Sequence, residues 1–209
     1  VAPALALGER ALLSGRDLLL AIVAGYEVQA RLGRIMKPGD KGFHGESVLG
    51  PFASVAVSGK LLSLNAEQMV HALAIGGSHS SGTHEYDQSG GEVKRLHASI
   101  AVRGGMMAAL LAQRGLTGPH TILEGLHGIC QVFGGVTDPE VVETILESLG
   151  DNWYAVQGCI VKRFPAEASM HTSFQAMERL MHEQQFQPDQ VEEMTLWVNR
   201  SSVTHVGSI

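Results

Sequence analysis

The sequence predicts a mainly α-helical protein, with an all-helical part over residues 1–152 and the beginning of a smaller α/β part over residues 153–209. Apolar residues recur at helical spacing through the first part, and side chains typical of helix starts separate its segments. After Gly150, aromatic and β-branched residues become frequent, which favours extended chain. With 209 residues, 44% of them hydrophobic, the chain can bury one core, or one core and part of a second domain.

The first strong helix is expected over residues 14–33. Ser14 can accept a hydrogen bond from the backbone N–H of Asp17, and the Asp17 carboxylate can stand in for the glutamate of a capping box. Gly33 fits the position just past the helix end. Since the middle of this segment is apolar nearly all round, we expect the helix to be buried.

Two further helices should follow at short intervals. A glycine-rich loop over residues 35–47 carries His44, and a helix is expected over residues 48–63. Asn65 and Gln68 then form the capping pair of the next helix. Helices joined by short turns are typical of a bundle.

A polar segment over residues 78–91 is longer than most connections between helices, and loops of that length are often functional. The helix after it, residues 93–115, is rich in small residues and should pack closely against its neighbours. Residues 117–135 suit a short helix or turns, and Asp138 with Pro139 predicts another helix start.

The α/β part is expected to begin with an extended segment that stops at Pro165. A clear helix follows over residues 166–184. Polar and apolar residues then alternate from Val191 to Val198, which is the period of a half-buried strand.

Composition excludes several classes of protein. A net charge of −6 without a lysine or arginine cluster argues against nucleic-acid binding. No apolar stretch reaches the roughly 20 residues of a membrane span, so no membrane partner is expected. Cys130 and Cys159 form no CxxC pair and are expected to be reduced, as in a cytoplasmic protein.

Two lysines stand out because each lies near an expected helix start. Lys94 belongs to "VKRLH" and Lys162 to "VKRFP". Free backbone N–H groups and the positive end of the helix dipole attract anions, and a lysine adds charge, so both places could bind a carboxylate or phosphate. The alternative is that both lysines are ordinary solvated side chains.

Histidines accompany the first lysine. His97 lies three residues after Lys94 and projects from the same helical face. His44 and His84 lie in the two polar loops. A histidine can move protons near neutral pH, although a hydrogen-bonded structural role is open for each of them.

Glu167 and His171 have the i, i+4 spacing of a metal-binding pair. No third ligand motif accompanies them, so no metal site is expected. GxSxG, Walker A and GxGxxG motifs are absent as well. The lysines and histidines therefore carry the case for catalysis.

Three segments together resemble the MmgE/PrpD family, which includes 2-methylcitrate dehydratases, cis-aconitate decarboxylases and iminodisuccinate epimerases. They are "FHGESVLGPFASVAVSGKLLSLNAEQ", "GGEVKRLHASIAVRGGMMAALLAQRGLTGPHTILEG" and "IVKRFPAEASMHTSFQAME". The resemblance implies a large helical domain with a smaller α/β lid, an active site in the cleft between them, and a homodimer. It also implies small di- or tricarboxylic acid substrates without a metal or organic cofactor. Helices before Val1 and most of the lid after Ile209 are expected to be missing.

The resemblance implies a lyase that dehydrates or decarboxylates its substrate by proton transfer next to a carboxylate, and "FPAE" looks more like the methylcitrate dehydratase branch. An epimerase on the same scaffold, or an inactive fragment that only binds carboxylates or dimerises, stays an alternative. The resemblance implies His44, Lys94, His97 and Lys162 as catalytic residues and His171 as a further active-site position. The predicted substrate-binding residues are Lys94, Lys162 and His171, together with His84 and Glu167.

Overall fold

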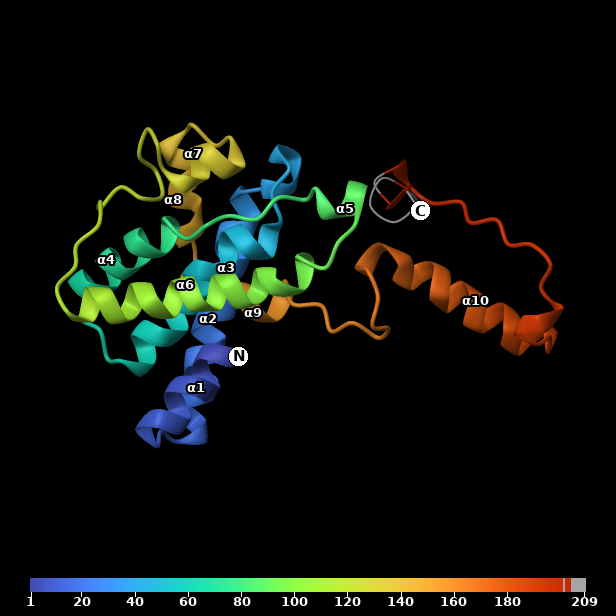
Figure 1. The fold of residues 1–209 in the computed structure, drawn as a ribbon, viewed down its shortest axis with the longest axis horizontal. Coiled ribbons are helices and arrows are strands. Elements are labelled where there is room, and N and C mark those ends of the chain that lie inside the picture. Colours follow the sequence, from blue (N-terminus) through green and yellow to red (C-terminus); the bar gives the residue numbers. More distant parts are fainter. Residues whose placement is uncertain (201, 204–209) are drawn as a thin grey trace. The chain divides into compact units, whose positions relative to one another are not determined.

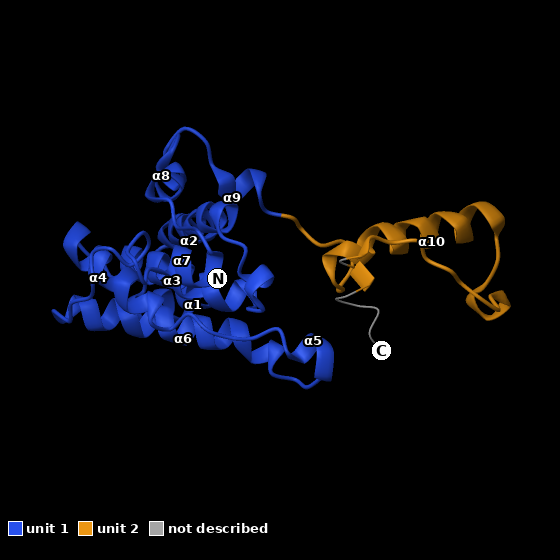
Figure 2. Cartoon of the chain, turned by 90° about the horizontal axis from the view of Figure 1, so that it is seen from above, with its two compact units in different colours: residues 1–159 blue, residues 160–209 orange. Residues whose placement is uncertain are grey.

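The computed structural model describes residues 1–200, 202 and 203. These residues form ten α-helices and four short 3₁₀-helices but no β-strand, which confirms the predicted mainly α-helical class. The chain divides into two compact units, residues 1–159 and residues 160–209 (Figure 2). The domain boundary expected near residue 152 stays a prediction. Within the described part of the chain, no helix is long and apolar enough to cross a membrane.

Five helices of ten residues or more build the first unit, and α3 lies at its centre (Figure 1). Helix α3 packs against all four of the others, and α6 also runs along α4. The fully buried side chains of α3 include Val48, Phe52 and Val55. The five helices are α1 (Ala2–Ala11), α2 (Gly15–Ile35), α3 (Gly45–Leu61), α4 (Ala66–Gly77) and α6 (Lys94–Gln113).

Small residues let α3 and α6 approach closely, as the composition of α6 predicts. A Cβ atom on Gly105 would lie 2.4 Å from the backbone oxygen of Pro51, and one on Gly50 would lie 2.7 Å from the Cβ of Ala101. Neither contact could be tolerated without moving a helix. The close packing therefore fixes the middle of α6 against the first half of α3.

Local signals predict the helix starts well. The Ser14 hydroxyl accepts a hydrogen bond from the Asp17 amide at 3.2 Å. Asn65 and Gln68 form a complete capping box. The Asp138 carboxylate accepts a hydrogen bond from the backbone N–H of Glu140 at 2.9 Å.

Two predicted helix bounds are wrong. Helix α2 continues past Gly33 to Ile35, because a glycine inside a helix is tolerated and the chain leaves the helix only at Met36, shortly before Pro38. Helix α3 begins at Gly45 rather than near residue 48, with His44 as its N-cap residue.

Short elements connect the long helices and complete the first unit. The polar segment 78–91, expected to be a loop, contains one short helix. The segment after Gly150, expected to be extended as far as Pro165, contains another short helix and forms no strand. Both cysteines are free thiols, Cys130 buried and Cys159 exposed. The short elements are η1 (Pro38–Lys41), α5 (Tyr86–Ser89), α7 (Ile129–Gly134), α8 (Pro139–Glu143), η2 (Thr144–Leu146) and α9 (Tyr154–Gln157).

Helix α2 is less buried than its sequence suggests. Leu19 and Leu20 are 65% and 50% exposed, because α2 packs mainly against α3 and α9 and leaves another face open. Its buried face instead carries an ion pair that the sequence analysis did not anticipate. Arg31 Nε donates to Glu27 Oε1 at 2.6 Å, and both residues are 5% exposed.

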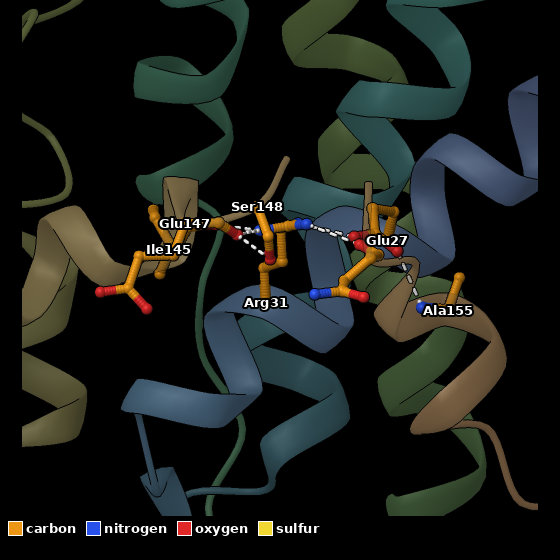
Figure 3. Close-up of polar contacts among 7 residues, drawn as sticks. Glu27, Arg31, Ile145, Glu147, Ser148 and Ala155 are labelled. Carbon is orange, nitrogen blue, oxygen red and sulfur yellow. Dashed lines mark hydrogen bonds and ion pairs between the residues drawn. The ribbon is translucent and has the colours of Figure 1, made fainter. Parts of the chain in front are cut away.

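Backbone groups from the end of the first unit complete this pair (Figure 3). Arg31 donates to the carbonyl oxygens of Ile145, Glu147 and Asn152, and Glu27 accepts from the N–H of Ala155 at 2.8 Å. Since all these groups are satisfied, the pair ties the segment 145–155 to α2 without leaving a buried charge unpaired.

The second unit contains η3 (Ala168–Met170), α10 (His171–Gln184) and η4 (Pro188–Gln190). The predicted helix over residues 166–184 is thus confirmed, with a later start. Residues 191–199 have no regular secondary structure, so the strand expected over Val191–Val198 is not formed. A strand needs a neighbour to bond with, and none exists among the described residues of this unit.

Candidate active site

Two loops of the first unit are joined by backbone pairing that positions two predicted site histidines. Phe43 and Thr83 form an isolated antiparallel bridge. The N–H of His44 donates to the carbonyl of Gly82 at 2.9 Å, and the N–H of His84 donates to that of Gly42, also at 2.9 Å. The bridge brings the two imidazoles together, with ring centroids 5.4 Å apart.

Gly82 makes this junction possible. Its φ of +87° lies in the region that favours glycine, and a Cβ atom would lie 2.5 Å from the Ser47 hydroxyl and 3.2 Å from His97 Cε1. A larger residue would therefore push the loop away from both α3 and α6.

His97, on α6, contributes the third imidazole of the site. Its side chain is buried, with 3% of the residue exposed, and its Nδ1 lies 2.9 Å from Nδ1 of His44. The other nitrogen of His44, Nε2, lies 2.8 Å from Oε2 of Glu46. When His44 Nε2–H donates to Glu46, the Nδ1 of His44 is free to accept from Nδ1–H of His97. The three side chains thus form a hydrogen-bonded chain along which a proton can move.

The pKa of His44 is lowered from its usual value. Burial is the main cause because it disfavours the charged ring, and the positive charges of His97, His84 and Lys94 act in the same direction. Glu46 opposes the shift. The net effect favours the neutral imidazole, which is the form that accepts a proton.

Tyr86, in the short helix α5, lies at the middle of the cluster and was missed by the sequence analysis. Its ring makes edge contacts with His44, His84 and His97, each with a centroid distance of 5.6 Å. Burial, with smaller contributions from Asp87 and Glu46, raises the pKa of Tyr86 to about 12. Its hydroxyl therefore stays protonated and can donate a hydrogen bond near neutral pH.

Lys94 is the first residue of α6, and its Nζ lies 5.2 Å from the centroid of the Tyr86 ring. Lys94 is exposed at the start of the helix, where the positive end of the helix dipole attracts an anion. The N–H groups of Arg95 and Leu96 already donate to the carbonyl oxygens of Glu92 and Val93. The neighbouring Arg95 instead pairs with Glu92 at 2.8 Å, and both of these side chains are exposed.

The remaining predicted site residues lie in the second unit. Lys162 Nζ donates to the carbonyl oxygen of Ala166 at 3.0 Å. The helical segment expected to begin near Pro165 begins only at Ala168, so the helix-end argument for Lys162 is not supported. Glu167 accepts from the N–H of Ser169 at 2.8 Å, as the cap of that segment.

His171 packs edge-on against Phe164, with centroids 5.4 Å apart. Its Nε2 is buried and makes no hydrogen bond to the described residues. The pKa of Glu167 is lowered: burial raises it, but hydrogen bonds from Ser169 and Ala168 and the charge of Lys162 outweigh that effect. The roles of Lys162, Glu167 and His171 stay predictions.

The first unit therefore brings together four of the predicted residues, His44, His84, Lys94 and His97, and adds Glu46 and Tyr86 to them. Glu46 stands inside the "FHGES" motif, and Tyr86 is the only tyrosine of the polar segment 78–91. These two positions are the features of the sequence by which Glu46 and Tyr86 could have been predicted as site residues. A neutral imidazole, a proton relay and a cation at a helix end can remove a proton from a small acid whose carboxylate is held nearby.

Comparison with known proteins places the sequence in a family. A model of the MmgE/PrpD N-terminal domain matches residues 1–142. Human cis-aconitate decarboxylase is 35% identical over 162 residues, which cover 76% of this chain and 32% of that protein. Cis-aconitate decarboxylase of Aspergillus terreus (strain NIH 2624 / FGSC A1156) is 29% identical over 201 residues, covering 93% and 39%. The chain thus spans between about a third and two fifths of the length of these relatives.

Proposed function

The chain belongs to the MmgE/PrpD family, and we propose that the protein is a lyase that acts on a small di- or tricarboxylic acid. The observation that carries this proposal is the contact between His44 and His97, 2.9 Å apart at Nδ1. The names of the relatives favour decarboxylation of cis-aconitate as the first reaction to test.

Substrate binding is assigned to the end of α6. A carboxylate of the substrate pairs with the Lys94 ammonium and is attracted by the positive end of the α6 helix dipole. No acidic residue occupies the first turn of that helix. Glu92, just before the helix, is paired with Arg95, and the anion relieves the unfavourable contact between the lysine and the helix dipole.

Proton transfer is assigned to the two imidazoles. In a decarboxylation, the bond to the leaving carboxylate breaks, its electron pair stays on the adjacent carbon, and an imidazolium of the pair protonates that carbon. In a dehydration, a neutral imidazole of the pair removes the proton next to a carboxylate, the C–O bond breaks as the double bond forms, and the pair returns that proton to the hydroxyl group, which leaves as water. Both routes require one proton shared between His44 and His97.

Two further groups support the charge that develops on the substrate. The Tyr86 hydroxyl, which stays protonated, donates a hydrogen bond to a developing oxyanion. Glu46 holds His44 in the tautomer that accepts at Nδ1. Binding roles for Lys162, Glu167, His171 and His84 belong to the same proposal, as does a homodimer, which light scattering of the purified protein tests.

Dehydration of 2-methylcitrate is the second candidate reaction, favoured by the glutamate at position 167 in "FPAE". The purified protein would be incubated with cis-aconitate and with 2-methylcitrate, and the products followed by NMR together with carbon dioxide release. Carbon dioxide from cis-aconitate supports the first reaction, and an unsaturated acid without carbon dioxide supports the second. A product of inverted configuration would show an epimerase, and no turnover of any acid would contradict the lyase.

A further inference from the structure

A second group of side chains converges where α4 begins, and the proposed lyase does not use it. Glu67 and His71 stand one turn apart on α4, and His120 reaches them from the loop after α6. His71 Nε2 lies 3.2 Å from Oε1 of Glu67, and His120 Nε2 lies 3.3 Å from the same oxygen. All the candidate ligand atoms lie within 4.8 Å of one another.

These distances suit a metal ion. Zinc bonds nitrogen and oxygen at about 2.0–2.1 Å in a tetrahedron, so neighbouring ligand atoms stand about 3.3 Å apart. The two distances to the Glu67 oxygen already have that length. The ligand nitrogens of the two histidines lie within 4.8 Å of each other, and the His120 side chain, 63% exposed, has room to move closer.

The backbone around Gly118 holds His71 as metal-binding histidines are usually held. His71 Nδ1 lies 3.2 Å from the carbonyl oxygen of Gly118. When Nδ1–H donates to that oxygen, the lone pair of Nε2 points toward Glu67 and His120, free to bind a cation. A Cβ atom on Gly118 would lie 2.6 Å from the Cβ of Ala74, so the glycine lets this loop lie against α4.

We infer that Glu67, His71 and His120 form a binding site for a divalent transition metal of the zinc class, with water in the fourth position. Two imidazoles and one carboxylate select such ions over Mg²⁺ and Ca²⁺, which prefer oxygen ligands. The ion would clamp the loop after α6 onto α4.

The site lies far from the histidine–lysine cluster and does not depend on the proposed function. Gln68, next to Glu67, donates from Nε2 to the carbonyl oxygen of Gln113, the last residue of α6, at 3.4 Å. Lys94 is the first residue of the same helix. A 20-residue helix is about 30 Å long.

A hydrogen-bonded arrangement without metal is the competing explanation. In that arrangement the N–H of Gly118 donates to His71 Nδ1, at 3.3 Å, and the Nε2–H groups of both histidines donate to Glu67. The Nε2 atoms of both histidines would then have no lone pair for a cation, and added zinc would bind no more tightly than at any exposed histidine.

The test is calorimetric titration of the purified, metal-free protein with Zn²⁺. We expect one equivalent per chain, no competition from Mg²⁺, and a shift of thermal unfolding to higher temperature with zinc. His120→Ala should weaken binding at least about tenfold and abolish the thermal shift. Because His120 is exposed, this variant should keep its fold, and Glu67→Gln provides a second test.

His127→Ala is the matched control, since His127 is an exposed histidine of the same loop. It should leave the affinity and the thermal shift unchanged. Equal binding by the wild-type protein and His120→Ala, or equal weakening by His120→Ala and His127→Ala, would overturn the assignment. Turnover of carboxylic acids has no part in these measurements, so the lyase and the metal site can fail separately.

Discussion

The Nδ1 atoms of His44 and His97 lie 2.9 Å apart although the residues are 53 positions apart in the chain. A contact of this length between two ring nitrogens requires one to donate and the other to accept. If both rings were charged, both atoms would carry hydrogen and repel each other. The pair therefore holds at most one extra proton, which makes it suited to taking up and returning a single proton.

Lys94 should matter for binding more than for proton transfer. Replacing it by alanine removes the cation at the start of α6 but leaves the imidazole pair in place, so KM for a carboxylic acid substrate should rise about tenfold or more while kcat changes less. Arg95→Ala is the control, because Arg95 pairs with exposed Glu92. Equal effects of the two variants on KM would argue against the assigned carboxylate site.

The lowered pKa of His44 predicts how stability depends on pH. Below the ordinary imidazole pKa of about 6.5, the unfolded chain takes up a proton at this position while the folded protein still resists it. The free energy of unfolding should therefore fall as the pH drops from about 6.5 toward the folded pKa. Denaturant unfolding at several pH values measures this slope, which should be smaller in His44→Gln. An identical slope in both proteins would be inconsistent with a lowered pKa.

Tyr86 is expected to act through both its ring and its hydroxyl. Tyr86→Phe keeps the ring against the three histidines and removes only the donor, so it should lower kcat by about 10²-fold if the hydroxyl stabilises developing charge. Tyr86→Ala should also raise KM, because the ring beneath Lys94 is lost. Wild-type kcat in Tyr86→Phe would limit Tyr86 to a packing role.

Breaking the buried pair of Glu27 and Arg31 should destabilise the first unit strongly. Arg31→Met leaves the Glu27 carboxylate buried without its partner and should cost about 3–5 kcal/mol. Arg95→Met, which breaks an exposed pair, should cost less than about 1 kcal/mol. Denaturant unfolding of the two variants provides the comparison, and similar losses would contradict the account.

Gly82→Ala should disturb the site both by a steric clash of the added Cβ atom and by an unfavourable backbone conformation. Its Cβ atom would meet the Ser47 hydroxyl and displace the loop that holds His44, so activity and stability should both fall. Gly115→Ala is the control: its φ of +91° is also unfavourable for alanine, but nothing lies within 4 Å of the added atom. The control should lose stability alone, by about 1–3 kcal/mol.

Features that depend on neighbouring residues were predictable from the sequence, and those that depend on distant segments were not. The caps at Ser14 and Asn65 need only residues three positions away. The place of Tyr86 among the histidines depends instead on the bridge between Phe43 and Thr83, which no local pattern encodes.

Dependence on distant segments also explains why some predictions from the sequence are wrong. Alternation over residues 191–198 predicts a strand, but a strand also needs a partner, and residues 191–199 form no sheet. An arginine such as Arg31 in α2 is ordinarily expected to be solvated. It is buried because carbonyl groups more than a hundred residues later in the chain face it.

The central claim, that His44 and His97 work as one unit in proton transfer, is tested most directly by a double-mutant cycle. Turnover of cis-aconitate would be measured for the wild-type protein, His44→Gln, His97→Gln and the double variant, with carbon dioxide release as the signal. We expect each single variant to lose about 10²–10⁴-fold in kcat and the double variant to lose little more. Losses that multiply independently, or single variants with wild-type kcat, would contradict the shared-proton account.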